Sequence, residues 1–318
     1  AAELKRAGYA VTVFEKEKEA GGLLRYAMPD YAGHRAELQA TVDELKQAGV
    51  EFRFETALTA APEGYDAAFA AAGAWEKQTS AISGAEKALD AREFLLRLNT
   101  GKTYAFTGSV AVIGNGWPAI DAARAAIRLG ADEVTILAPS AFPARSAYRE
   151  ALALAREEGV SVLENVQTTA IGKNCVEFSV NGAKMTISVS AVLLENSYTA
   201  QEFANTVKPG RITNVISAIS AGKNAAAQID RQLRGEAATL QPIAPVKTVN
   251  PEKVRSRSGY LKKEPNPVHL NAPAAERKSG FAPYARVMTE AEAQKESSRC
   301  LNCGCGEGCQ LCKTICTD

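Results

Sequence analysis

Long apolar runs and an excess of one charge are both missing from this chain of 318 residues. No apolar segment approaches the roughly 20 residues that a membrane-spanning helix needs, so we expect no membrane span. The formal net charge of +1 provides no electrostatic basis for binding nucleic acid. The first residues also lack the basic and then apolar pattern of a signal peptide, and we therefore expect a cytoplasmic protein.

Residues that commonly carry nucleophilic or acid–base catalysis are scarce as well. His34 and His269 are the two histidines, and they are isolated from each other in the sequence. No Ser-His-Asp grouping and no paired-carboxylate pattern stands out, so no catalytic residue is predicted. Cys175 stands apart from the other cysteines, and we expect it to be an inert core residue.

The other six of the seven cysteines crowd into residues 300–316. A disulfide framework would spread its cysteines over the fold, whereas this density indicates a metal centre. The spacing resembles part of a ferredoxin-type run and predicts a [4Fe-4S] cluster, with a four-cysteine zinc site as the alternative. The predicted ligands are Cys300, Cys303, Cys305, Cys309, Cys312 and Cys316.

Strand and helix patterns alternate along most of the chain, which predicts an α/β fold with parallel sheets covered on both faces. Residues 1–7 have a helical pattern, and residues 9–15 have that of a buried strand ending in Glu15. This is the second half of a βαβ unit, so we expect the first strand and its glycine loop to precede Ala1. Glu15 would then bind the ribose of a dinucleotide. Further predicted helices cover residues 33–50, 91–98, 118–129, 147–158, 215–233 and 288–298, and further predicted strands cover residues 51–56, 65–72, 110–113 and 133–137.

A complete strand–turn–helix unit begins at Ser109 and carries the pattern G-x-G-x-x-A at Gly114, Gly116 and Ala119. The glycines permit a tight turn and let backbone N–H groups approach a pyrophosphate, to which the helix N-terminus adds partial positive charge. The pattern therefore predicts a Rossmann-like dinucleotide site. The next strand runs into residues 137–140, which offer neither an acid for a ribose diol nor arginines for a 2′-phosphate.

Three runs resemble the glutamate synthase small-subunit family: residues 11–31, 112–124 and 214–223. The resemblance implies a FAD domain split by an inserted NAD(P)H domain. Hydride would pass from nicotinamide to flavin, and single electrons would leave through [4Fe-4S] clusters. The implied flavin contacts are Glu15, Gly22, Leu23, Arg25, Gly73, Asn214 and Val215, and the implied nicotinamide contacts are Gly114, Gly116 and Ala119.

The element pattern and the resemblance together predict two Rossmann-like domains and an irregular cysteine-rich tail. Residues 1–107 would form the first part of a truncated FAD-type domain, and residues 108–195 an inserted NAD(P)H-type domain. Residues 196–240 would return to the FAD-type domain. Residues 241–287 are rich in Pro, Lys, Arg and Asn and predict an extended linker, which leads to an iron–sulfur region at residues 288–318.

The chain also departs from the family pattern. The first glycine loop is missing, and no Gly-Asp segment lies between Leu194 and Asn214. The cysteines follow the dinucleotide domains instead of preceding them. We therefore predict an electron-transfer module that works with a redox partner subunit or an upstream domain of a larger polypeptide, and not glutamate synthesis. The alternative is a structural or docking subunit that has lost its cofactors, which the bulky Trp117 beside the glycine turn favours.

Overall fold

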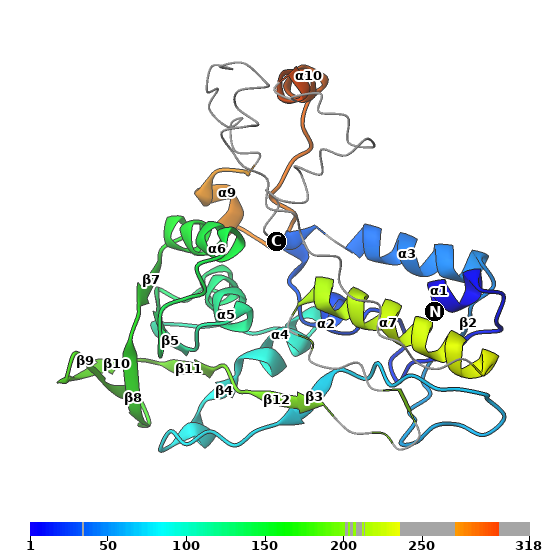
Figure 1. Cartoon of the computed structure of the whole chain (residues 1–318). Coiled ribbons are helices and arrows are strands. Elements are labelled where there is room, and N and C mark those ends of the chain that lie inside the picture. The colour runs from blue at the N-terminus through cyan, green and yellow to red at the C-terminus, as the bar shows by residue number, and fades with distance from the viewer. Residues whose placement is uncertain are drawn as a thin grey trace, which may run out of the picture. The chain divides into compact units, whose positions relative to one another are not determined.

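The structure is a computed structural model in which residues 1–33, 35–200, 203, 206–207, 212, 214–235 and 271–298 are described (Figure 1). It divides into a larger unit, Ala1–Ala238 with Ala274–Pro283, and a smaller unit, Thr239–Pro273 with Tyr284–Asp318. Both histidines and the six clustered cysteines lie outside the described residues.

A five-stranded parallel sheet forms the centre of the larger unit, with the strand order β4-β11-β5-β6-β7. It confirms the predicted α/β class with parallel strands. Its short runs of Val, Ile and Leu are buried on both faces, as is typical of parallel sheets. The strands are β4 (Leu89–Asp90), β5 (Ser109–Ile113), β6 (Glu133–Leu137), β7 (Val160–Leu163) and β11 (Ala191–Leu194).

Side-chain alternation along β5 divides the core into two layers, because successive residues of a strand point to opposite faces. Val110 and Val112 belong to a buried cluster shared with three helices. Ala111 and Ile113 belong to a second buried cluster on the other face. The helices of the first face are α4 (Ala91–Asn99), α5 (Trp117–Arg128) and α6 (Ser146–Glu157).

An antiparallel sheet, and not a layer of helices, packs on the second face. Val176 and Phe178 are its buried contacts with the main sheet. The turn Asn181-Gly182 has φ angles of 49° and 84°, the left-handed geometry that a two-residue hairpin requires. Cys175 is partly exposed at the start of β9, so it is not a fully buried core residue as predicted. The strands are β8 (Val166–Ile171), β9 (Cys175–Val180) and β10 (Ala183–Ser188).

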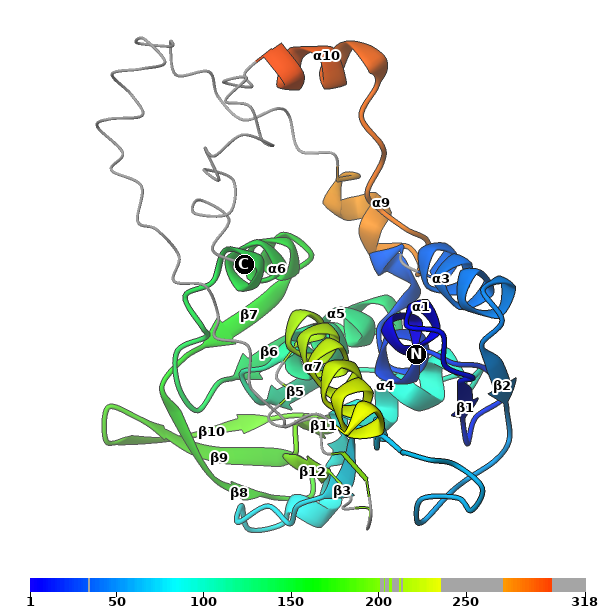
Figure 2. The ribbon, with the colours of Figure 1, turned by 45° about the vertical axis from the view of Figure 1, so that its right-hand side comes forward.

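The N-terminal part of the larger unit contains one pair of parallel strands, β1 (Thr12–Phe14) and β2 (Glu51–Arg53). β1 is shorter than the predicted strand, and all three of its residues are half-buried where burial was expected. Three helices, α1 (Ala2–Arg6), α3 (Arg35–Gln47) and α7 (Val215–Arg234), belong to the same part (Figure 2). The Tyr9 hydroxyl group ties the segment after α1 to α7 by donating to Asp230 Oδ1 at 2.9 Å.

The strand predicted over residues 65–72 does not form. Phe69 makes only an isolated bridge with Val207, because the surrounding run of alanines has little β-propensity. The chain instead enters β3 (Ala74–Lys77), which pairs antiparallel with β12 (Tyr198–Ala200).

Shorter helices complete the described fold. Within the stretch predicted to be an extended linker, a helical turn forms and packs in the larger unit. The predicted helix before the cysteines forms over Glu290–Ser298 in the smaller unit. The short elements are α2 (Gly22–Tyr26), the 3₁₀ helices Asp30–Ala32 and Ala85–Lys87, α9 (Ala274–Lys278) and α10 (Glu290–Ser298).

A buried carboxylate, Glu158, joins distant parts of the larger unit. It caps the C-terminus of α6 and accepts hydrogen bonds from Arg124 at 2.9 and 2.7 Å and from Arg128 at 2.7 Å. Arg277 of α9 donates to the same carboxylate at 2.9 Å. Burial alone would raise the pKa of Glu158, but the hydrogen bonds from Arg124 and Arg128 outweigh it and hold the pKa at about 2.

Tyr31 extends this cluster to the N-terminal part of the chain. Its ring lies 4.5 Å from the guanidinium groups of both Arg124 and Arg128, and its hydroxyl donates to Asp121 at 2.9 Å. Phe281 stacks on the same ring at 6.3 Å. Three segments that are remote in sequence therefore meet around one buried charge.

We predict that Glu158→Gln destabilises the protein strongly, because it removes the negative charge that three buried guanidinium groups share. The expected loss in the free energy of unfolding is about 3–5 kcal/mol. Glu157→Gln is the matched control: its side chain is 57% exposed although it also contacts Arg277, and it should cost less than about 1 kcal/mol. Urea denaturation measures both. Equal losses in the two variants would contradict the role of Glu158.

Acid should also remove the stabilisation that the Glu158 carboxylate provides. The folded-state pKa of Glu158 lies below its ordinary value of 4.5, so the unfolded chain binds the proton more readily. The stabilisation is complete above pH 4.5 and is lost progressively as the pH falls towards about 2. Its size is about 3 kcal/mol. We therefore predict that the stability gap between wild type and Glu158→Gln narrows over this window in denaturation curves recorded at stepped pH. A gap independent of pH would contradict the prediction.

Candidate functional site

The predicted glycine turn lies at the carboxyl end of β5, where ligands of parallel α/β sheets bind. Gly114 has a φ of +153° and donates its N–H to Leu137 O at 3.2 Å. Gly116 is the N-cap of α5. Ala119 is fully buried, and its Cβ lies 3.1 Å from where a Cβ on Gly114 would stand, so a small residue is needed there. The structure thus brings the three predicted nicotinamide contacts together.

Glu195, which follows β11, places its carboxylate group directly in this turn. Its Oε2 atom accepts a hydrogen bond from the Gly116 N–H at 2.8 Å, and the Asn115 backbone N–H also donates to it. A Cβ atom on either Gly114 or Gly116 would overlap this carboxylate. The space that glycine provides beside the turn is therefore filled by a side chain of the protein itself.

The surroundings of the Glu195 carboxylate disfavour its charged form. Burial raises its pKa, although the N–H groups of Gly116 and Asn115 act in the opposite direction. Arg92 favours the charged form, and Asp90 disfavours it. A pyrophosphate would need the same N–H donors and the same space, so the turn does not fit a nicotinamide dinucleotide while Glu195 is in place.

The aromatic rings of Trp117 and Tyr148 pack against each other beside the glycine turn. Trp117 is the first residue of α5 and is 42% exposed, and its ring lies 4.7 Å from that of Tyr148 in α6. Asn115 reaches the end of β6 by donating from Nδ2 to Ser140 Oγ at 2.7 Å. Ser140 therefore supports the turn itself.

Two of the predicted flavin contacts, Glu15 and Gly73, lie next to residues that contact each other at the end of β1. Glu15 is half-buried and accepts from the Glu17 N–H at 3.0 Å. The neighbouring Lys16 lies 4.3 Å from the ring of Trp75, which itself donates its indole N–H to Ala72. The turn at Gly73, with a φ of +76°, is thereby held near the end of β1.

Gly22, Leu23 and Arg25 occupy the following helix, α2. Gly22 has a φ of +51°, and Leu23 is 38% exposed. Arg25 is buried, and its guanidinium group donates to Gln39 Oε1 and to Ala20 O, both at 2.7 Å. Arg25 therefore holds α2 against α3. Because its guanidinium group is engaged in these hydrogen bonds, it would contact a ligand through its backbone and the aliphatic part of its side chain.

Asn214 and Val215 form the start of α7. The Asn214 side chain accepts from Ser217 N at 2.8 Å, and Ser217 Oγ accepts from Asn214 N at 3.0 Å, which completes a reciprocal capping box. Val215 and Ile216 are 46% and 66% exposed. The start of α7 thus presents exposed apolar side chains at a helix N-terminus, a surface suited to a planar ring.

The predicted metal site lies outside the described residues: Cys300, Cys303, Cys305, Cys309, Cys312 and Cys316. Among the residues that the structure does describe, no group of three or more His, Cys, Asp or Glu side chains is placed to hold a metal ion. No helix in those ranges is both long and apolar enough to cross a membrane.

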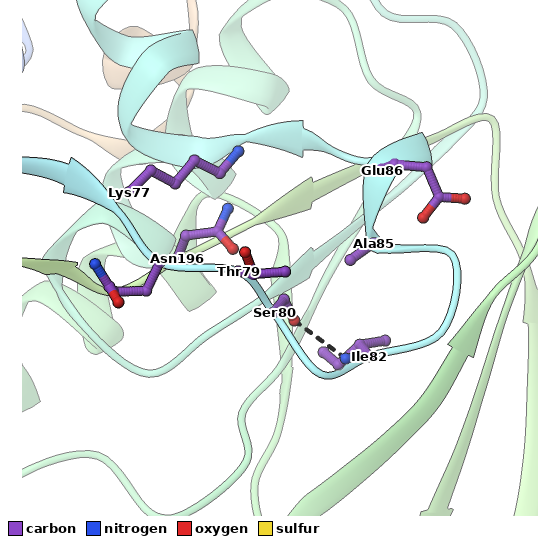
Figure 3. Close-up of a pocket in the computed structure, with 8 residues that line it drawn as sticks. Lys77, Thr79, Ser80, Ile82, Ala85, Glu86 and Asn196 are labelled. Atoms are coloured by element: carbon purple, nitrogen blue, oxygen red, sulfur yellow. Dashed lines mark hydrogen bonds between the residues drawn. The ribbon is translucent and has the colours of Figure 1, made fainter.

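A polar cluster and a shallow cavity lie beside the paired strands β3 and β12. Asp90 is buried, caps α4, and accepts from Asn196 Nδ2 at 2.6 Å, while Lys77 Nζ lies 3.3 Å away. The adjoining cavity, of about 320 Å³, contains none of the predicted cofactor contacts (Figure 3). Its lining residues are Lys77, Gln78, Thr79, Ser80, Ile82, Ala85, Glu86 and Asn196.

Glu195 is the site residue that sequence reasoning missed. The signal was available, because an acid directly after an apolar strand is the same pattern that drew attention to Glu15. What the sequence does not reveal is that β11 lies next to β5, which carries the end of one strand to the turn of the other.

Comparisons with known proteins agree with this architecture. Residues 1–202 match the family described as pyridine nucleotide-disulphide oxidoreductase. The NADP(+)-dependent formate dehydrogenase subunit beta of Moorella thermoacetica is 25% identical over 95% of this chain and 52% of its own length. The glutamate synthase [NADPH] small chain of Halomonas elongata is 31% identical over 55% of this chain and 41% of its own. The chain thus spans about half the length of these relatives.

Solved structures show the same fold at low sequence identity. The thioredoxin reductase of T. acidophilum superimposes with a TM-score of 0.50 at 15% identity, covering 74% of this chain and 94% of that one. This likeness supports an α/β fold with parallel sheets of the two-Rossmann type.

We predict that the cost of Gly116→Ala depends on Glu195. The backbone at Gly116 has a φ of −103°, so alanine is not strained there and the cost comes from overlap with the carboxylate. The loss in the free energy of unfolding should be about 1–3 kcal/mol smaller in a Glu195→Ala background than in wild type. A double-mutant cycle by urea denaturation measures this coupling, and additive losses would show that the two residues do not meet.

Proposed function

Because this chain belongs to the pyridine nucleotide-disulphide oxidoreductase family, we propose that it is an electron-transfer module of a larger redox assembly. FAD and NAD(P)H are the cofactors that the family implies. In the proposal, electrons pass between nicotinamide, FAD and [4Fe-4S] clusters, and then to a partner domain or subunit in the cytoplasm. The family match over residues 1–202 is the observation that carries the proposal.

The first unit is the better supported cofactor site. Glu15 after β1, the positive φ of Gly22 and the exposed apolar first turn of α7 at Val215 all suit a flavin dinucleotide. Bound FAD would supply the step between two-electron and one-electron chemistry. The protein would bind the ribose through Glu15 and would cover one face of the flavin ring with apolar side chains.

The cysteine segment is proposed to bind the clusters through Cys300, Cys303, Cys305, Cys309, Cys312 and Cys316. It follows directly on α10, whose start is fixed by Glu292: the Thr289 N–H donates to Glu292 at 2.8 Å, and Arg286 donates to it at 2.7 and 2.6 Å. A helix with a fixed start gives the cysteines a defined point of attachment. The relatives support a partner subunit, because one of them is named as a subunit of a formate dehydrogenase.

A docking subunit without working cofactors is the second candidate. The Glu195 carboxylate in the glycine turn favours it, because a filled turn does not fit a nicotinamide dinucleotide. The two candidates differ in what the purified protein should contain.

We expect the anaerobically purified chain to contain one FAD and roughly four irons with matching acid-labile sulfide. Replacing both Cys309 and Cys312 with serine should remove the iron while the flavin stays, because the two cofactors bind different parts of the chain. Cys175→Ser, in β9, is the control and should retain both. Flavin absorbance, iron and sulfide assays and zinc analysis measure the contents. Iron without flavin would favour the docking subunit, and zinc in place of iron would refute the redox role of the cysteines.

A further inference from the structure

The Glu195 carboxylate occupies the position that the phosphates of a dinucleotide take at a glycine turn. We propose that Glu195 is an internal stand-in for phosphate that closes the second dinucleotide unit, so that NAD(P)H must displace it in order to bind. This inference rests on the proposed function, since it concerns the nicotinamide site that the family implies.

Glu195 and a pyrophosphate compete for the same hydrogen-bond donors. Backbone N–H groups at a helix N-terminus bind phosphate and carboxylate in the same way, through hydrogen bonds and the partial positive charge of the helix. The Gly116 N–H already donates to Glu195 at 2.8 Å, and the Asn115 N–H donates to the same carboxylate. A pyrophosphate therefore gains these donors only when Glu195 gives them up.

Glu195 also occupies the space that a pyrophosphate needs. The two glycines of the turn leave room for close approach, and the Glu195 side chain fills the positions where a Cβ of Gly114 or Gly116 would stand. Two anionic groups at one turn would also repel each other. Arg92 supplies positive charge near the carboxylate, whereas Asp90 adds negative charge. Burial and the charge of Glu195 both raise the pKa of Tyr148. With this balance, the site does not hold both a carboxylate and a pyrophosphate.

Displacement of Glu195 requires only its side chain to move. The Glu195 N–H donates to Ile113 O at 2.8 Å, which continues the pairing of β11 with β5 and fixes the backbone. The residue as a whole is half-buried, so it is not enclosed on every side. Displacement is therefore a change of rotamer and needs no rearrangement of the sheet.

To test this, NADH and NADPH are titrated into the full chain, and binding is measured by nicotinamide fluorescence. Glu195→Ala should lower the dissociation constant by at least roughly tenfold, because it removes the competing group and its charge. Glu195→Gln should fall between that variant and wild type, since it keeps an acceptor but loses the charge. Glu133→Gln is the matched control: it removes the same charge at the first residue of β6, the opposite end of the sheet from the turn, and should leave binding unchanged.

Each outcome separates the inference from the proposed function. Wild type binding as tightly as Glu195→Ala would overturn the inference and leave the proposed function standing. No binding by Glu195→Ala, with its circular dichroism spectrum and flavin content unchanged, would overturn both the inference and the nicotinamide part of the proposed function. Equal gains from Glu133→Gln and Glu195→Gln would reduce the effect to overall charge and would also overturn the inference.

Discussion

The charge balance around Glu158 is the interaction on which the larger unit depends. A carboxylate at the C-terminus of a helix is unfavourable for the helix dipole, and burial makes it more so. Arg124 and Arg128 of α5 and Arg277 of α9 offset both costs by donating to the same two oxygen atoms. Since the guanidinium groups come from separate segments, satisfying one charge also fixes how those segments pack.

The carboxyl ends of the parallel strands carry the chemistry. β5 ends at the glycine turn, and β11 beside it ends at Glu195, so the order of the strands in the sheet decides which side chains meet there. The same rule that places a dinucleotide at this edge also places any acid that follows a neighbouring strand. In this fold, the edge of the sheet that binds a ligand is thus also the edge at which a side chain of the protein can take the ligand's place.

Much of the fold could be predicted from local patterns. The strand and helix around Gly114 were predicted within a residue or two, because apolar runs, glycines and helix formers agree with each other there. The antiparallel sheet β8–β10 was not foreseen as a cover for the main sheet, since alternating strands carry no mark of the surface they will meet. The partners of Glu158 and the position of Glu195 were missed for a related reason: both depend on contacts between residues far apart in sequence, which periodicity does not encode.

The pair β3–β12 has a mechanical consequence. β3 precedes the five-stranded sheet in the chain and β12 follows it, and the two strands are hydrogen-bonded side by side. Asp90 holds both of them, through Lys77 on β3 and through Asn196, just before β12. Because the two strands are paired and share the buried carboxylate of Asp90, any twist imposed on β3 must also twist β12.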